Sequence, residues 1–212
     1  MTQTISIDIY SDTICPWCYI GHNKLQTAIF EYNKLTFDII WRPFQLNPDM
    51  PREGMERQKY LDHKFGGKDN AKKIYDDIYK AGKEIGIYFQ FDNITVTPNS
   101  FASHKLLALA YKLNKQNEVI NSLFFSYFIE GKNIGNKEIL INIAKQHHIF
   151  NIQTSDYFFS NKDNNSLLNE EKHAKELGIK GVPCFIIDKK FVVYGAQTKE
   201  NFINIFNSIT DV

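Results

Sequence analysis

The stretch Cys15-Pro16-Trp17-Cys18 follows an apolar run at residues 5–10 and precedes an amphipathic run with a helical period. A helix that begins at Cys15 points unpaired backbone N–H groups at the first sulfur, which favours its thiolate. Pro16 suits the first turn because its missing N–H would have no partner there. Cys18 then lies one turn later, within reach of a disulfide with Cys15. The order strand, loop, C-x-x-C, helix is typical of a dithiol redox site.

Length and composition limit the class of protein. The chain has 212 residues, enough for one large domain or for a domain with a sizeable insertion. Its formal net charge is +1, so the overall balance gives no reason to expect nucleic acid or an anionic membrane surface as a partner. The N-terminus has no basic region followed by an apolar one, and the apolar stretches are too short to span a membrane. We expect a soluble, cytoplasmic protein.

The cysteine count separates a redox site from a metal site. The chain has 3 cysteines, too few for a disulfide framework and, in a reducing compartment, not expected to form one. A structural zinc site needs four ligands, commonly from two C-x-x-C pairs or from one pair plus two histidines. Only Cys184 and scattered histidines remain to complete such a set. The sequence therefore predicts a redox-active pair and no metal.

The order of the expected elements predicts the fold class. Period-two alternation indicates strands, and period 3.6 indicates helices. Strands are expected at residues 4–10, 36–41, 182–187 and 191–194, and helices at 16–33, 167–177 and 198–209. Residues 51–162 carry helical stripes only, so we expect an all-helical insertion there. Residues 1–50 and 163–212 would then form one α/β domain, β-α-β followed by α-β-β-α, with helices on both faces of a sheet.

Several segments of the chain resemble a known family. They are residues 11–21 around the C-x-x-C, residues 42–51 (RPFQLNPDMP), residues 98–106 (PNSFASHKL), and Gly181-Val182-Pro183 with Gly195-Ala196-Gln197. Together they resemble the DsbA-like thioredoxin domain family, and within it the FrnE-type oxidoreductases. This branch is related to 2-hydroxychromene-2-carboxylate isomerase and to kappa-class glutathione transferases. The resemblance covers nearly the whole chain and implies a thioredoxin fold with a helical insertion.

The resemblance also implies roles for individual residues. Cys15 would be the attacking cysteine and Cys18 the resolving one. Pro183 would be a cis-proline, preceded by Val182, whose loop lies against the C-x-x-C and receives substrate backbone. Asp8 falls near the place where related oxidoreductases keep a buried acid under the second cysteine, so it is a candidate proton relay.

Three further side chains have open alternatives, and two histidines have one expectation each. Trp17 is either a substrate platform or a partly exposed aromatic that caps the helical block. Cys184 is either a small buried apolar residue in a strand or a third thiol close to Cys15. His22 is expected to be exposed on the first helix, and His104 is expected to be a structural histidine. Arg42 is either a surface charge or a holder of an anionic substrate group.

These residues favour one function over two others. We expect a thiol–disulfide oxidoreductase that acts on protein or small-molecule thiols and disulfides, with no bound cofactor and with glutathione as a candidate co-substrate. The first alternative is a glutathione-dependent isomerase or transferase of the 2-hydroxychromene-2-carboxylate isomerase or kappa type. That branch uses Ser at the first position of the motif, which Cys15 does not match. The second alternative is a non-catalytic, partner-binding thioredoxin-fold module. The oligomeric state is left open.

Overall fold

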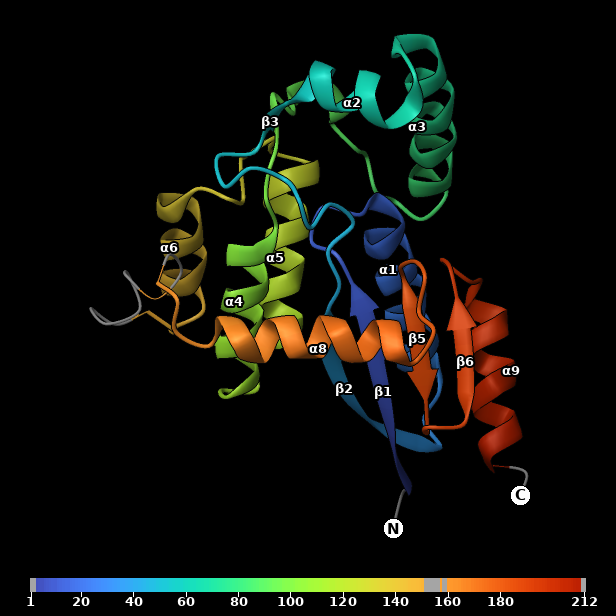
Figure 1. The fold of residues 1–212 in the computed structure, drawn as a ribbon. Helices are drawn as coiled ribbons and strands as arrows, with labels where there is room; N and C mark the ends of the chain where they lie inside the picture. The colour runs from blue at the N-terminus through green and yellow to red at the C-terminus, as the bar shows by residue number, and fades with distance from the viewer. Residues whose placement is uncertain (1–2, 151–156, 158–159, 211–212) are drawn as a thin grey trace.

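A four-stranded sheet forms the centre of the molecule (Figure 1). The computed structural model describes residues 3–150, 157 and 160–210. The strands lie in the order β2-β1-β5-β6. Their bounds are Gln3–Ser11 for β1, Leu35–Pro43 for β2, Cys184–Ile187 for β5 and Phe191–Tyr194 for β6. β1 and β2 are parallel, whereas β5 pairs antiparallel with β1, and β6 with β5. All four strands expected from the sequence are present.

Alternation along β1 gives the sheet two different faces. Ile5, Ile7 and Ile9 are buried in the main apolar core. Asp8 and Tyr10 point to the opposite face, because successive side chains of a strand alternate. Whether a residue of β1 has an odd or an even number therefore decides which face of the sheet, and so which helices, its side chain contacts.

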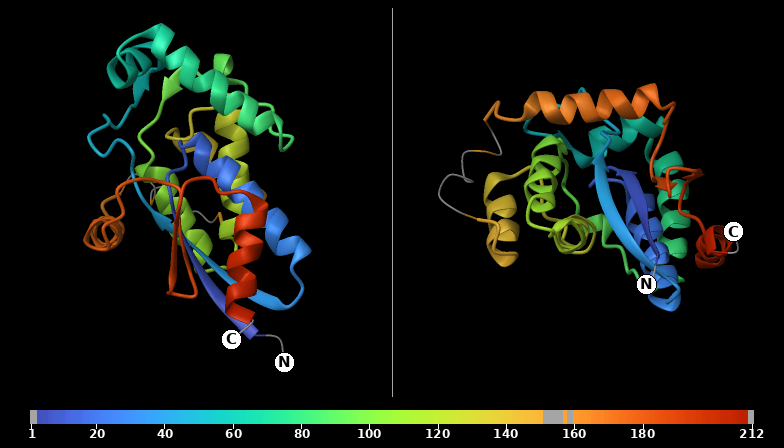
Figure 2. Two further views of the ribbon diagram at one scale, coloured as in Figure 1. Left: turned by 90° about the vertical axis from the view of Figure 1, so that its right-hand side faces the viewer. Right: turned by 90° about the horizontal axis from the view of Figure 1, so that it is seen from below.

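Helices cover both faces of this sheet. α1 (Pro16–Glu31) packs against α9 (Lys199–Thr210) on one face, and α8 (Asn164–Glu176) runs across the other and contacts β2 (Figure 2). This arrangement confirms the predicted α/β thioredoxin-like fold. α8 begins at Asn164, before the helix start expected at residue 167.

The insertion is mostly helical, as expected, but it also contains two short strands. Its elements are β3 (Met55–Glu56), α2 (Arg57–Phe65), α3 (Lys68–Lys83), η1 (Phe91–Asn93), β4 (Val96–Thr97), α4 (Phe101–Tyr111), α5 (Gln116–Phe128) and α6 (Lys137–Gln146). β3 and β4 pair antiparallel. Apolar periodicity does not predict α2, because Arg57 is its only buried residue. The Glu56 side chain starts this helix by accepting bonds from the backbone N–H groups of Gln58 and Lys59.

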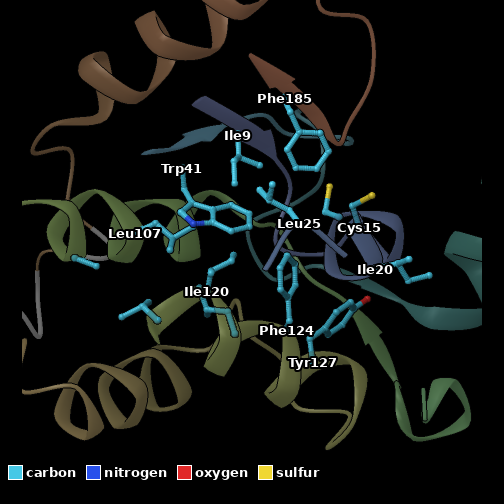
Figure 3. Close-up of a cluster of buried hydrophobic side chains, with 14 of the residues drawn as sticks. Ile9, Cys15, Ile20, Leu25, Trp41, Leu107, Ile120, Phe124, Tyr127 and Phe185 are labelled. Carbon is cyan, nitrogen blue, oxygen red and sulfur yellow. The ribbon is translucent and has the colours of Figure 1, made fainter. Parts of the chain in front are cut away.

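One apolar core joins the insertion to the sheet. Trp41 of β2, Phe124 of α5 and Phe185 of β5 belong to the same buried cluster (Figure 3). The buried Lys105 of α4 donates hydrogen bonds to the Ser160 carbonyl oxygen and to Asn164 Oδ1, at 2.7 and 3.0 Å. The boundaries at residues 51 and 163 stay a prediction, since packing continues across them. Over the described ranges, no helix combines the length and apolar character that crossing a membrane requires.

Candidate redox site

The two cysteines of the motif lie at the N-terminal end of α1. Cys15 is the N-cap residue, with extended backbone angles (φ −93°, ψ 113°), and Pro16 occupies the first turn. The Cys15 carbonyl oxygen accepts bonds from the N–H groups of Cys18 and Tyr19, at 3.0 and 3.3 Å. Both thiols are buried, with 4% of Cys15 and 1% of Cys18 exposed. The helix therefore begins where the sequence places it, with the first sulfur at its positive end.

Cys18 is held as a neutral thiol. Burial raises its pKa well above the usual range, and the neighbouring Cys15 raises it further. The Ser11 side chain and the backbone of Asp12 act in the opposite direction but do not cancel the effect of burial. At neutral pH this sulfur keeps its proton, so it cannot compete with Cys15 as the nucleophile.

A loop from the other end of the chain closes over the first sulfur. The Val182–Pro183 peptide bond is cis, and Cys15 Sγ lies 3.8 Å from the Val182 carbonyl oxygen. α1 reaches this loop closely because it has glycine at position 21, where a Cβ atom would lie 3.2 Å from Pro183 Cγ. Trp17, between the two cysteines, is 38% exposed. The structure thus brings together every residue expected at the motif and at the proline loop.

Asp8 does not join this group, and the expectation of a carboxylate under Cys18 at this position is wrong. Its Oδ1 lies 2.7 Å from Arg42 Nε, and Arg42 Nη1 lies 3.2 Å from Glu170 Oε2 of α8. Asp8 occupies an even-numbered position of β1, so its side chain faces α8, whereas Cys18 lies on the α1 side of the sheet. Arg42 is accordingly a structural charge between β1 and α8.

Asp12 is the buried carboxylate next to the motif. It is fully buried and accepts hydrogen bonds from the N–H groups of Ile14 (3.3 Å, to Oδ1) and Leu46 (2.7 Å, to Oδ2). Its carbonyl oxygen accepts a bond from the Cys15 N–H at 3.0 Å. The N-cap residue of α1 is Cys15, so Asp12 does not cap this helix. The sequence feature that could have identified Asp12 is its position as an acidic residue just beyond the end of an apolar strand.

Two more titratable groups lie behind Asp12. His104 Nε2 of α4 is 3.5 Å from Asp12 Oδ1 and has no hydrogen-bond partner. Glu171 of α8 is buried, and its Oε1 is likewise without a partner. Burial raises the pKa of Glu171, the charge of His104 lowers it, and Asp12 raises it further. The loop before α1, the insertion and α8 thus converge on one buried charged cluster.

Cys184 lies away from the motif. It is fully buried in β5, paired with Tyr10 and packed with Ala174 of α8. Burial raises the pKa of this thiol to about 11. The position matches the small buried residue that the sequence allows as one alternative, since the Tyr10 face of β1 is opposite to the face of α1.

His22 is not exposed, contrary to expectation. Only 2% of it is accessible, its ring meets Trp41 edge-on at 4.9 Å, and Nε2 lies 2.9 Å from Asn121 Oδ1. Burial lowers its pKa to about 4. His22 is buried because α5 of the insertion covers this face of α1. The sequence around His22 does not indicate this contact.

Among the residues whose placement the structure gives, no three or more His, Cys, Asp or Glu side chains gather in a way that could hold a metal ion.

The profile of the DSBA-like thioredoxin domain family matches residues 6–206 of the chain. The chain therefore belongs to this family, as its motifs led us to expect. It is also similar to YwbO of Bacillus subtilis (strain 168), with 26% identity over 203 residues, which is 94% of each chain.

Solved structures share the fold at lower identity. The probable DsbA oxidoreductase SCO1869 from Streptomyces coelicolor has TM-score 0.87 and 21% identity, covering 98% of this chain and 90% of that one. The cytosolic disulfide reductase DsbM from Pseudomonas aeruginosa, solved with GSH, has TM-score 0.67 and 14% identity, covering 98% and 100%. A 2-hydroxychromene-2-carboxylate isomerase has TM-score 0.66 and 12% identity, covering 97% and 95%. These likenesses show the fold alone.

Proposed function

We propose that the protein is a thiol–disulfide oxidoreductase of the FrnE type, with Cys15 as nucleophile and Cys18 as resolving thiol. The observation that carries this proposal is the asymmetry of the pair. Cys15 lies at the positive end of α1, while Cys18 is buried with a raised pKa. One sulfur is thus placed to attack while the other stays protonated until it is needed.

The reaction proceeds by two exchanges. The Cys15 thiolate attacks one sulfur of a substrate disulfide; a Cys15–substrate bond forms, the substrate disulfide breaks, and one substrate thiolate leaves. Cys18 then loses its proton and attacks Cys15 Sγ, which releases the second substrate thiolate. The substrate gains two electrons, and the protein keeps a Cys15–Cys18 disulfide. Run in reverse, the same steps oxidise a dithiol.

The loop at Val182 and Pro183 is the proposed place for substrate backbone. The Val182 carbonyl oxygen already faces Cys15 Sγ at 3.8 Å, so an extended segment that pairs with this loop would bring its sulfur to the nucleophile. The half-exposed Trp17 ring would cover the same segment. Substrates would be protein or small-molecule thiols and disulfides, and the setting a reducing cytoplasm. The structure of DsbM with GSH makes glutathione a reasonable co-substrate.

Two rival functions are distinguishable. A glutathione-dependent isomerase or transferase needs no second thiol, so its activity would survive Cys18→Ala. A non-catalytic binding module would show ordinary thiol reactivity at Cys15. Neither rival gives a reason for a second cysteine one turn along the same helix, buried beside the first.

The test is the equilibrium of the reduced protein with a glutathione redox buffer, measured by alkylation and mass shift. We expect a two-electron transition that is lost in Cys15→Ser and in Cys18→Ser and kept in Cys184→Ser, the matched control. The reduction potential at the midpoint of this transition, compared with that of the cytosolic glutathione pool, gives the direction of the reaction in the cell. If the pair never closes while glutathione binds, the isomerase or transferase takes the place of this proposal.

A further inference from the structure

Arg57 is a buried cation that has no acidic partner among the described residues. It is the first residue of α2 and is 9% exposed. Its Nη1 donates a hydrogen bond to Thr97 Oγ1 at 3.0 Å. Over the described part of the chain, no Asp, Glu or chain terminus lies within 4.0 Å of its guanidinium nitrogens. A guanidinium has five N–H donors and normally forms ion pairs when buried, so this one has capacity for an anion.

Tyrosine side chains surround this guanidinium. Its central carbon lies 4.8 Å from the centre of the Tyr75 ring and 5.7 Å from that of Tyr60. The hydroxyl of Tyr127 is buried and has no hydrogen-bond partner. Burial raises the pKa of Tyr75 and of Tyr127, and in both cases the charge of Arg57 is the next largest influence and lowers it. Both phenols stay neutral, so they do not neutralise Arg57, and the Tyr75 hydroxyl is a donor for an anion bound there.

The Arg57–tyrosine cluster borders the redox site. α3, which carries Tyr75, contacts α1, which begins at the motif, and the charge of Cys15 contributes to the raised pKa of Tyr75. The Tyr60 hydroxyl accepts a bond from Asn47 Nδ2 at 3.3 Å, and Asn47 follows Leu46, whose N–H binds Asp12. Figure 1 shows α2 and α3 arching over the end of α1 that carries the motif.

Solvent reaches the cluster through a cleft. Arg57 and Tyr75 line a hollow of about 870 Å³ between α2, α3 and the segment before β4. Its apolar wall includes Phe89 and Ile94, whereas the exposed Lys72 at its edge is paired with Asp76 at 2.7 Å. Three carboxylates also line the cleft, those of Glu56, Asp76 and Asp92. Glu56 accepts bonds from two backbone N–H groups at the start of α2, and Asp76 is paired with Lys72. The buried guanidinium of Arg57 is therefore the group in this cleft that can hold a carboxylate whose apolar stem lies on Phe89 and Ile94.

We propose that Arg57, with the hydroxyl of Tyr75, is an anion subsite that selects disulfide substrates carrying a carboxylate near the sulfur. The inference rests on the proposed function and adds a substrate class to it. The carboxylate binds at Arg57 while the disulfide is presented to Cys15. No bond forms or breaks at the subsite, and the exchange steps at sulfur are those given above.

The test compares two disulfides of similar reactivity and different charge. Reduced protein is mixed with oxidised glutathione, which is anionic, or with bis(2-hydroxyethyl) disulfide, which is uncharged, and oxidation of the motif is followed by quenched alkylation. In Arg57→Gln we expect the rate with oxidised glutathione to fall roughly tenfold or more, as for loss of a charge-assisted bond, and the rate with the uncharged disulfide to stay within about twofold. Arg42→Gln is the matched control, since Arg42 is already paired with Asp8 and Glu170. It should leave the ratio of the two rates unchanged.

The outcomes separate the subsite from the chemistry. Equal losses with both disulfides, or no loss with either, overturn the subsite and leave the oxidoreductase proposal standing. If wild-type protein exchanges with neither disulfide, the proposed function itself fails, and the subsite with it. Should Arg57→Gln not fold, wild-type protein still tests the subsite, because it must react several-fold faster with oxidised glutathione than with its tetraethyl ester. Equal rates with acid and ester contradict the proposal.

Discussion

His104 Nε2 lies 3.5 Å from Asp12 Oδ1, and the two side chains are 3% and 0% exposed. This contact joins α4 of the insertion to the loop that begins the redox motif. Asp12 in turn holds the segment after β2 through the Leu46 N–H. The insertion is therefore bound to the loop before the motif by a polar contact as well as by the apolar core.

Asp12→Asn should destabilise the protein. The amide keeps the size of the carboxylate but has one acceptor oxygen, so it leaves either the Ile14 or the Leu46 N–H buried without a partner. We expect the free energy of unfolding to fall by about 2–3 kcal/mol, measured by urea denaturation. Asp38→Asn, at an exposed position of β2, is the control and should change it by less than about 0.5 kcal/mol. Similar losses in both variants would contradict the role given to Asp12.

Native alkylation should distinguish the three thiols. Cys18 and Cys184 are buried with pKa values raised by burial, while Cys15 lies at the positive end of α1. With iodoacetamide at pH 7.5, reduced native protein should take up one adduct per chain, at Cys15, and denatured protein three. Peptide mapping by mass spectrometry assigns the site. Early labelling of Cys18 or Cys184 in the native protein would show that burial does not protect them.

The sequence predicts the strands and helices of this molecule better than it predicts the positions and partners of the charged side chains. The alternation of Ile5, Ile7 and Ile9 is a local signal, and so is the Cys-Pro start of α1; both elements form as expected. Asp8 lies within β1 and pairs with Arg42, whereas Asp12 lies beyond the end of β1, in the loop before α1, where it is buried. The apolar alternation of the strand does not tell which of these two acids is buried at the motif.

Other side chains depend on partners distant in the sequence. α5 buries His22, as shown by its bond to Asn121, 99 residues along the chain. Thr97 and Tyr75 surround Arg57 from β4 and α3. No periodicity within α1 or α2 records these contacts, because they form only when the insertion packs. The sequence at the start of α2 therefore gives no indication that Arg57 is buried.

Gly21→Ala should impair exchange more than stability. The new Cβ would lie 3.2 Å from both Pro183 Cγ and the Phe185 ring, so the proline loop must shift by a few tenths of an ångström. Alanine is also the better helix former by up to about 1 kcal/mol, which offsets the tight contact. We expect a several-fold slower reaction with bis(2-hydroxyethyl) disulfide and little change in thermal midpoint.

Gly181→Ala is the matched control for this variant. It places the same methyl group in the proline loop, where a Cβ meets nothing within 4 Å. An unchanged rate in Gly21→Ala, or equal slowing in both variants, would mean that the contact between α1 and Pro183 does not set the position of the loop.

His22 should make the fold sensitive to mild acid. Burial lowers its pKa to about 4 from an unfolded value near 6.5, so the unfolded chain binds more protons between these two values. The stabilising contribution is complete above pH 6.5 and is lost as the pH falls toward 4, about 3 kcal/mol in total. A proton added at Nδ1 would be buried without an acceptor, because Nδ1 has no hydrogen-bond partner.

The measurement is the free energy of unfolding in urea at pH 7.5 and at pH 4.5, for wild-type protein and for His22→Gln. Glutamine does not titrate, so its loss of stability on acidification should be smaller than that of the wild type by roughly 2–3 kcal/mol. His63→Gln, at an exposed position of α2, should keep the wild-type dependence. If His22→Gln and wild type lose the same free energy between the two pH values, His22 is not held neutral by burial. The acid sensitivity of the fold must then arise from other groups, such as His147, whose pKa is also lowered by burial. Glu171 is not among them, because a carboxyl group with a raised pKa gains protons on folding.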